Sequence, residues 1–410
     1  MWKRYVKHHL ISFHNLLVVC SIVLLLALIA VFSLLSELHE QRRLPSVINY
    51  SNFPSSSNNT TSSLSSEYSN EYCVPFDVIQ TISSPKTLTI DLLIPWVDGS
   101  DPKWLEKKNN FSLKKQDLTS NRFTSHDELK YCLRSIEKHF PDFGTIYLLT
   151  DNQRPDWLND NERVKIISHK DIVPEHLHDE VLPTFNSQSF EVFLWNIPGI
   201  SDNYLYLNDD FFFGADVDLS YFLNDQFYTV YYDETKILNR EPGKVVYHHM
   251  MRHNINLIEK KLGSLKPKID FRYIAHAPRL INKQLFKHVF NMFEEAFLEA
   301  ARTKFRGEGS LVEPLSLYIF TLGSLSNSTE CGREFIHFKR SYMSYVSLRK
   351  NIRGQKRLFE AIQVVKPPFF NVNDNLEGIS ESNSRVVDES LKIYYSLMDS
   401  WYGEKSSFET

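Results

Sequence analysis

The sequence predicts an α/β fold with a mainly parallel sheet, and three observations lead to this prediction. Between residues 88 and 214, apolar runs and helix-period segments follow in the order strand, helix, strand, strand, helix, strand, which is typical of parallel sheets with helical crossovers. Polar residues follow these strands at their carboxyl ends, where open sheets of this kind bind ligands. The 29 Phe and 20 Tyr, against 13 Gly, indicate a packed globular body in this chain of 410 residues.

A membrane anchor is predicted near the N-terminus. Leu16 to Leu35 is a run of 20 uncharged residues, long enough for one membrane-spanning helix. Lys3, Arg4 and Lys7 precede it, which favours a cytoplasmic tail, residues 1–15, and a luminal body. A cleaved signal peptide is the alternative, but no clear cleavage site of small residues follows the run. We therefore expect a single-pass type II protein of the secretory pathway.

A polar stem is predicted between the anchor and the body, over residues 36–87. Ser51 to Ser69 is dominated by Ser, Asn and Thr, a composition too polar to form a core. In a luminal protein the Asn-x-Ser/Thr sequons are plausible glycan sites. They begin at Asn49, Asn58, Asn59, Asn110 and Asn327.

The cysteines leave their pairing open. Cys132 falls on an apolar helix face, which predicts a buried thiol. Cys73 and Cys331 could form a disulfide, but the sequence alone does not establish it. No Cys-x-x-Cys motif or cluster of His and Cys suggests structural zinc.

The folded body is expected to open with a buried strand at Thr89–Val97. This run is almost entirely apolar, as in strands covered on both faces, and it ends in the turn Asp98-Gly-Ser-Asp-Pro102. The turn would present Trp96 and Asp98 at the carboxyl edge of the sheet. An indole could stack on a base and a carboxylate could hold ribose hydroxyls, although an ordinary strand-to-helix turn has the same composition.

The next elements have clear boundaries in the sequence. Ser125–Glu128 matches a capping box and predicts the start of a helix that ends at Pro141. Strands are predicted at Thr145–Thr150 and Val164–Ile167, and a further helix at Asn186–Asn196.

The stretch Asn203–Gly214 is the strongest candidate for a site within this half. Alternating leucines and tyrosines predict a short buried strand, which leads directly into Asn208, Asp209 and Asp210. Two adjacent carboxylates among aromatic residues are costly unless water, hydrogen bonds or a cation compensates them. Hard oxygen ligands suit Mg²⁺ or Mn²⁺ bridging to substrate phosphates. A simple turn at the end of a strand is the alternative.

Several separated motifs resemble those of the Stealth family of sugar-phosphate transferases. Residues 90–102 are similar to the first signature region, and residues 121–214, which include Asp127-Glu-Leu-Lys-Tyr131, Leu182-Pro-Thr-Phe-Asn-Ser187 and Asn208-Asp-Asp210, to the second. Ala275-His-Ala-Pro278, together with Phe305-Arg306, resembles the third region. Pro368–Asn375 resembles the fourth region, and Ser406–Glu409 resembles the C-terminal tail of the family.

The resemblance implies a reaction and a fold. The family includes a Golgi enzyme that places GlcNAc-1-phosphate on lysosomal glycans, bacterial capsule polymerases and fungal xylosylphosphotransferases. It implies transfer of a sugar-1-phosphate from a nucleotide sugar, usually UDP-linked, to a hydroxyl of a glycan or glycoprotein, with release of UMP. The implied fold resembles a type-A, Rossmann-like glycosyltransferase domain. It divides residues 88–410 into a nucleotide-sugar half, 88–214, and a helical half, 215–410, that completes the site. The resemblance to the Golgi enzyme of this family also implies a location in the Golgi membrane.

The resemblance also implies roles for individual residues. Asp209, Asp210 and Asp374 would hold Mg²⁺ or Mn²⁺, with Asp210 also counted among the catalytic residues. His276 would take the proton of the acceptor hydroxyl as a general base. Arg306 would clamp phosphoryl oxygens with its planar fork. The remaining candidates, for contacts with the nucleotide, sugar or phosphate, are Trp96, Asp98, Gly99, Arg122, Asp151, Asn186, Ser187 and Asn208.

One geometric condition must hold for His276 and Arg306 to share a site. Apolar residues recur at helical spacing between them, and a straight helix over Asn282–Thr303 would be about 30 Å long. Such a helix would keep the two residues apart. We therefore predict a break near Asn291 to Phe293, giving an antiparallel helix pair that returns Arg306 to the site.

Two other functions remain open from the sequence. A conventional metal-dependent glycosyltransferase would share the first strands and the aspartate pair but release UDP. A membrane-anchored lectin would bind glycans without turnover. The 46 basic and 50 acidic residues, with a formal charge of −4, give no support for a nucleic-acid partner. Homo-oligomerisation stays open.

Overall fold

The computed structural model describes residues 72–74, 89–111, 123–224, 227–237, 245–263, 269–306, 309–326, 331, 335–340, 344–376 and 384–410. The predicted anchor, the predicted stem apart from residues 72–74, and Arg122 lie outside these residues. Within them, no helix combines the length and the apolar character that a membrane span requires.

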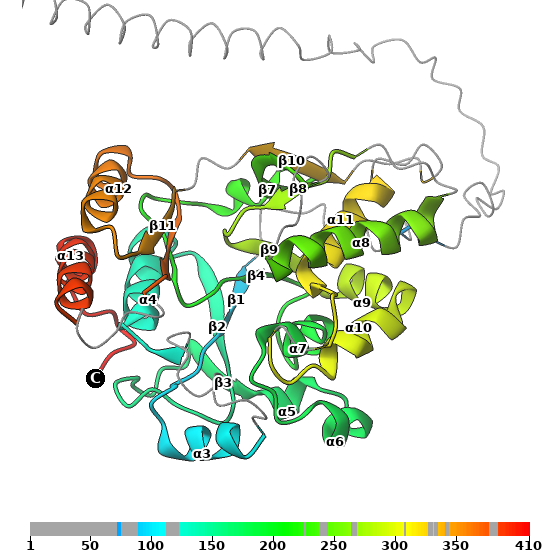
Figure 1. Ribbon diagram of the computed structural model, residues 1–410, viewed down its shortest axis with the longest axis horizontal. Coiled ribbons are helices and arrows are strands. Elements are labelled where there is room, and N and C mark those ends of the chain that lie inside the picture. The colour runs from blue at the N-terminus through cyan, green and yellow to red at the C-terminus, as the bar shows by residue number, and fades with distance from the viewer. Residues whose placement is uncertain are drawn as a thin grey trace, which may run out of the picture. The chain divides into compact units, whose positions relative to one another are not determined.

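A five-stranded sheet forms the centre of the body (Figure 1). Its order is β3 (Val164–Ser168), β2 (Phe143–Thr150), β1 (Ile90–Pro95), β4 (Asn203–Tyr206) and β9 (Arg279–Asn282). The first four strands are parallel and only β9 runs antiparallel, against β4. The prediction of a mainly parallel sheet is therefore confirmed.

Burial on both faces explains the apolar sequence of the central strand. Leu92, Leu93 and Ile94 of β1 are fully buried, because helices cover both sides of a parallel sheet. In Figure 1, α4 (Glu128–His139) lies on one side of the central strands, and α7 (Ser187–Glu191) lies on the other. The helix predicted at Asn186–Asn196 is split into α7 and a separate short 3₁₀ turn, Leu194–Asn196.

The capping box predicted before α4 was wrong. The helix begins at Glu128, and its N-cap is Asp127 in the left-handed region, at a φ of 62°, with no side-chain cap bond. The Glu128 carboxylate instead accepts hydrogen bonds from Ser125 Oγ, at 3.2 Å, and from the His126 amide. The left-handed turn at Asp127 shifts the helix start, so Glu128 faces a cavity rather than capping the helix.

The predicted break in the following helical region is confirmed. Helix α9 (Lys283–Met292) ends at Phe293, and α10 (Glu294–Ala301) begins directly after it. The rings of Phe286 and Phe297 lie 6.0 Å apart, whereas eleven residues of straight helix would separate them by about 16 Å. The chain therefore turns back at Phe293.

The second half contains strands as well as the helices predicted for it. Strand β9 completes the central sheet, and a three-stranded sheet has the order β11-β12-β5. Strand β5 (Phe211–Phe212) lies at the end of the first half, and the elements of the second half not yet bounded are β6 (Leu223–Asn224), β7 (Phe227–Lys236), α8 (Val246–Leu262), β8 (Arg272–Ile274), α11 (Pro314–Ser326), β10 (Ile336–Arg340), β11 (Ser344–Leu348), α12 (Ile352–Val365), β12 (Phe370–Asp374) and α13 (Ser384–Tyr402). The remaining helices of the first half are α3 (Pro102–Phe111), α5 (His169–Ile172) and α6 (His178–Val181).

Long-range links join distant parts of the chain. Cys73 and Cys331 form a disulfide across 258 positions of sequence, which resolves the pairing that the sequence left open. Cys132 is a buried free thiol, as predicted. Near the C-terminus, Arg134 of α4 donates two hydrogen bonds of 2.7 and 2.6 Å to the Glu409 carboxylate, so the tail is tied to α4.

Candidate active site

A cavity of about 340 Å³ opens where the predicted polar strand ends meet. Trp96 follows β1, and the run Asn208–Asp210 follows β4; both line the cavity. Asp374, at the end of β12, joins them from the other half of the chain. The carboxyl edge of the central sheet is therefore one boundary of the cavity, as expected for an open α/β sheet.

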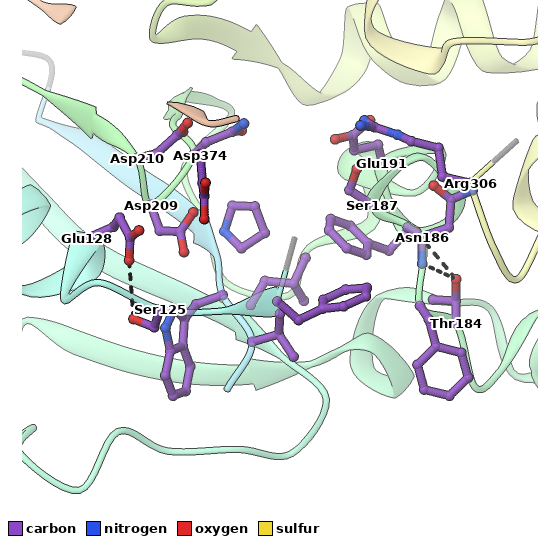
Figure 2. Close-up of a pocket in the computed structure, with 18 of the residues that line it drawn as sticks. Ser125, Glu128, Thr184, Asn186, Ser187, Glu191, Asp209, Asp210, Arg306 and Asp374 are labelled. Atoms are coloured by element: carbon purple, nitrogen blue, oxygen red, sulfur yellow. Dashed lines mark hydrogen bonds between the residues drawn. The ribbon is translucent and has the colours of Figure 1, made fainter. Parts of the chain in front are cut away.

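Carboxylates gather on one wall of this cavity (Figure 2). Burial, with the charges of Asp210 and Glu128 beside it, raises the pKa of Asp209 well above its usual range. Burial likewise raises the pKa of Glu128. Within the described residues, Asp210 Oδ1 is buried without a hydrogen-bond partner. This wall concentrates negative charge with too few compensating groups, as expected of a surface that receives a cation.

His126 holds Asp374 against this wall. His126 Nε2 lies 3.2 Å from Asp374 Oδ2, and both side chains are largely buried. The Leu376 amide donates a 2.8 Å hydrogen bond to Asp374 Oδ1. Burial alone would lower the pKa of His126, but the hydrogen bond to Asp374 and the charge of Glu128 raise it. The pair fixes the orientation of the Asp374 carboxylate.

The opposite wall is built by α7 and the segment after α10 (Figure 2). Asn186 caps α7, since its side chain accepts a 3.3 Å hydrogen bond from the Gln188 amide. Its Nδ2 donates to the Thr303 carbonyl at 3.0 Å, which ties α7 to the residues just before Arg306. Asn186, Ser187, Glu191 and Arg306 all line the cavity.

His276 and Arg306 line the same cavity, so the geometric condition set by the sequence is met. His276 Nε2 lies 3.7 Å from Asp210 Oδ2, and the His276 ring meets Phe211 edge-on at 4.7 Å. The imidazole thus stands between the aspartate wall and open space, with a third of its side chain exposed. Such a group can accept a proton from a bound hydroxyl and share the resulting charge with Asp210.

Aromatic side chains form the end of the cavity near β1. Trp96, Trp104, Phe123 and Phe185 line it, and the rings of Trp104 and Phe123 lie 4.9 Å apart. Flat apolar surfaces of this kind suit the face of a nucleobase.

Three of the predicted residues that the structure describes do not line the cavity, and a fourth is not among the described residues. The Asp98 carboxylate accepts a 2.8 Å hydrogen bond from the Ser100 amide and shapes its own turn. Gly99 packs against Phe123, where an added Cβ would meet the backbone oxygen at 2.0 Å. Asp151 pairs with Lys107 at 2.8 Å. Arg122 lies outside the described residues.

Comparison with known proteins assigns the family. The family model for Stealth protein CR1, conserved region 1, matches residues 89–116, and that for CR2, conserved region 2, matches residues 122–231. The capsular polysaccharide phosphotransferase fcs1 of Haemophilus influenzae is 30% identical over 329 residues, which cover 76% of this chain and 84% of fcs1. The chain belongs to the Stealth family.

Other relatives and solved structures extend this comparison. The exopolysaccharide phosphotransferase cps2G of Lactiplantibacillus plantarum is 28% identical over 347 residues, which cover 78% of this chain and 96% of cps2G. The match to the exopolysaccharide phosphotransferase SCO6023 of Streptomyces coelicolor, at 27% identity, spans only 52% of that protein. Among solved structures, the galactosyltransferase LgtC aligns with 73% of this chain and 95% of its own at 11% identity and a TM-score of 0.34.

Three residues of this Stealth site were missed by sequence reasoning. Glu128 was predicted as part of a capping box, His126 lies inside the same pattern without a predicted role, and Glu191 falls in the predicted helix Asn186–Asn196 without a predicted role. All three are buried or half-buried, and Glu128 and Glu191 line the cavity. For Glu191 there was a signal: a single charge follows Phe190 and precedes Val192 and Phe193 in an apolar stretch.

The donor set of the Stealth site fits a hard cation only in part. In the described ranges, no group of three or more His, Cys, Asp or Glu side chains is arranged to hold a metal ion by itself. Mg²⁺ in phosphoryl-transfer sites is commonly held by one or two carboxylates together with substrate phosphates. The unpartnered oxygen of Asp210 and the buried carboxyl group of Asp209 fit that arrangement.

Proposed function

We propose that this Stealth phosphotransferase moves a sugar-1-phosphate from a UDP-linked sugar to a hydroxyl of a glycan or glycoprotein and releases UMP. One observation carries the proposal: His276, Arg306 and the aspartate pair, far apart in sequence, line a single cavity. The names of two relatives, an exopolysaccharide and a capsular polysaccharide phosphotransferase, support transfer to a saccharide.

In the proposed reaction, the acceptor oxygen attacks the β-phosphorus of the donor. The hydroxyl proton passes to His276, and the bond between the β-phosphorus and the bridging oxygen breaks, so that the electron pair leaves with UMP. Asp210, whose Oδ2 lies 3.7 Å from His276 Nε2, stabilises the imidazolium that forms. Arg306 stabilises the charge on the phosphoryl oxygens through its planar fork.

The donor would lie along the cavity from its aromatic end to its charged end. The base would stack on the surface of Trp96 and Trp104, and the sugar would contact Asn186, Ser187 and Asn208, which line the cavity. Asp98, Gly99 and Asp151 would act indirectly: Asp98 and Gly99 shape the turn that follows Trp96, and Asp151 pairs with Lys107 of α3.

A divalent cation is part of the proposal. Asp209 and Asp210 would hold Mg²⁺ or Mn²⁺ together with the substrate phosphates, and Asp374, oriented by His126, would join them as a third ligand only once the ion and the donor are bound. When bound, the ion would neutralise negative charge on the diphosphate.

The proposed setting is the lumen of the secretory pathway, with the Golgi membrane as the specific location. It rests on the predicted anchor and sequons. The Cys73–Cys331 disulfide supports it, because disulfides persist in oxidising compartments and are rare in the cytosol.

The test is the identity of the released nucleotide. The full-length protein, purified in detergent, is incubated with a panel of UDP-sugars, Mg²⁺ or Mn²⁺, and a mannoside acceptor. We expect UMP, which disappears with EDTA and in the His276→Ala variant. Release of UDP instead would show attack at the anomeric carbon and establish the conventional glycosyltransferase.

A further inference from the structure

Glu191 is a buried carboxyl group in the cavity wall that the proposed reaction does not use. It is the last residue of α7, with only 6% of its surface exposed, and it lines the same cavity as Arg306. Tyr206 Oη donates a 2.9 Å hydrogen bond to Glu191 Oε1. A buried carboxyl group is unfavourable unless hydrogen bonds or positive charge compensate it. Its neighbours therefore indicate its role.

Two arginines supply positive charge around Glu191. Figure 2 shows the side chain of Arg306 extending toward Glu191, on the wall opposite the aspartates. Arg279 of β9 pairs directly with Tyr206 of β4, and side chains of antiparallel partners lie on the same face of the sheet. Arg279 is therefore next to the tyrosine that binds Glu191.

We propose that Glu191 is a positioning residue that holds the guanidinium group of Arg306 in the cavity, while Tyr206 fixes the direction of the carboxyl group. The inference rests on the proposed function, in which Arg306 binds the transferred phosphoryl group. Arg306 lies in a turn after α10 and is exposed, so its long side chain would otherwise occupy many rotamers. A guanidinium group that is already aimed loses less entropy when it meets the phosphoryl oxygens.

The protonation of Glu191 would give its attraction for Arg306 a pH dependence. The groups that face it are Glu313, which precedes α11, Tyr206, Arg279 and Arg306. Burial, with the charge of Glu313, raises the pKa of Glu191 to about 7, although both arginines oppose the rise. The group is neutral below this pH and ionised above it. Because the ionised form attracts Arg306 more strongly, the contribution of Glu191 to turnover should increase as pH rises through about 7.

A double-mutant cycle tests the role. Glu191→Gln keeps the size of the side chain and an acceptor for Tyr206 but removes the charge. We expect kcat to fall by roughly tenfold or more, with a smaller change in the KM for the donor. In an Arg306→Ala background, Glu191→Gln should have no further effect, because its role is exerted through the arginine. Tyr206→Phe should behave alike, with a smaller loss.

The matched control is Glu180→Gln. Glu180 is an exposed glutamate that pairs with Arg302 at 2.6 Å outside the cavity, and its substitution should leave turnover unchanged. The ratio of wild-type kcat to Glu191→Gln kcat should increase as pH rises through about 7, since His276 acts as the general base in both proteins and its effect cancels in the ratio.

Two outcomes would overturn the inference: additive losses in the cycle, or a ratio of wild-type to Glu191→Gln kcat that does not change with pH. If Glu191→Gln does not fold, as judged by thermal unfolding, the cycle of Tyr206→Phe with Arg306→Ala decides in its place. Rates are measured as total nucleotide released. UDP in place of UMP would therefore overturn the proposed function while leaving the coupling between Glu191 and Arg306 measurable.

Discussion

Asp209 and Asp210 lower the stability of the folded protein at the same cavity where they are proposed to bind a cation. The pKa of Asp209 is raised by burial and by Asp210 and Glu128. A carboxyl group whose pKa is higher in the folded than in the unfolded chain lowers the stability of the fold at pH values above its unfolded pKa. At neutral pH the Asp209 carboxyl group, beside Asp210 and Glu128, therefore destabilises the fold unless a cation binds to it.

Asp209→Asn should consequently stabilise the protein while inactivating it. Without added divalent cation, the amide removes the repulsion, and we expect the midpoint of thermal unfolding to rise by about 2 °C or more. UMP release should be lost. Thermal melts with and without Mg²⁺ check this, since Mg²⁺ should stabilise the wild-type protein more than the variant. A lower midpoint for Asp209→Asn without cation would contradict this account.

His276→Ala should abolish turnover without unfolding the protein. Loss of a general base typically lowers the rate by about 10² to 10⁴-fold, and a side chain that is one-third exposed contributes little to the core. The measurement is UMP release at saturating donor. The control is His176→Ala, an exposed histidine that does not line the cavity, and equal losses in the two variants would refute the role of His276.

The sequence predicted some of the residues that line the cavity correctly and others incorrectly. Asp209, Asp210 and Asn208 follow a clear strand and lie at the cavity, and His276, Arg306 and Asp374 were placed there through motif resemblance. Asp98 and Asp151 also follow strands, but their carboxylates are held by Ser100 and Lys107. The partner of a side chain depends on contacts between segments that are far apart in sequence, and a local sequence pattern cannot predict such contacts.

At the scale of elements, periodicity predicted the central strands well because each is a short apolar run ended by polar residues. The start of α4 was missed, since the left-handed backbone of Asp127 leaves no signature in its own residue type. The break at Phe293 was predicted from a different kind of reasoning, namely that a straight helix would have separated two residues of one site.

Phe297 tests the element that carries Arg306 back to the cavity. Its ring is fully buried, 6.0 Å from Phe286 and 5.7 Å from Phe290. Phe297→Ala should lower the free energy of unfolding by about 3–5 kcal/mol, measured by urea titration. Phe111→Ala, at a ring that is 43% exposed, is the control and should cost much less. A similar cost for both variants would contradict the packing described for α9 and α10.

At the scale of the whole molecule, the Cys73–Cys331 disulfide is the longest covalent constraint described. It closes a loop of 258 positions, for which a chain-entropy model gives about 5 kcal/mol as an upper estimate. Reduction with dithiothreitol should lower the unfolding midpoint of the wild-type protein but not that of Cys73→Ser. An equal response of both would exclude the disulfide as the cause. A soluble fragment that begins after Cys73 should be less stable than one that includes it.

The contact between His126 and Asp374 joins positions 248 residues apart, and it has a consequence for biosynthesis. A ribosome must complete most of the polypeptide before both sides of the cavity exist, and contacts of such long sequence separation form slowly. Nascent chains and early folding intermediates therefore lack the complete cavity. Catalytic competence is acquired late, after synthesis of nearly the entire body, so a truncated product of interrupted synthesis would be inert rather than partially active.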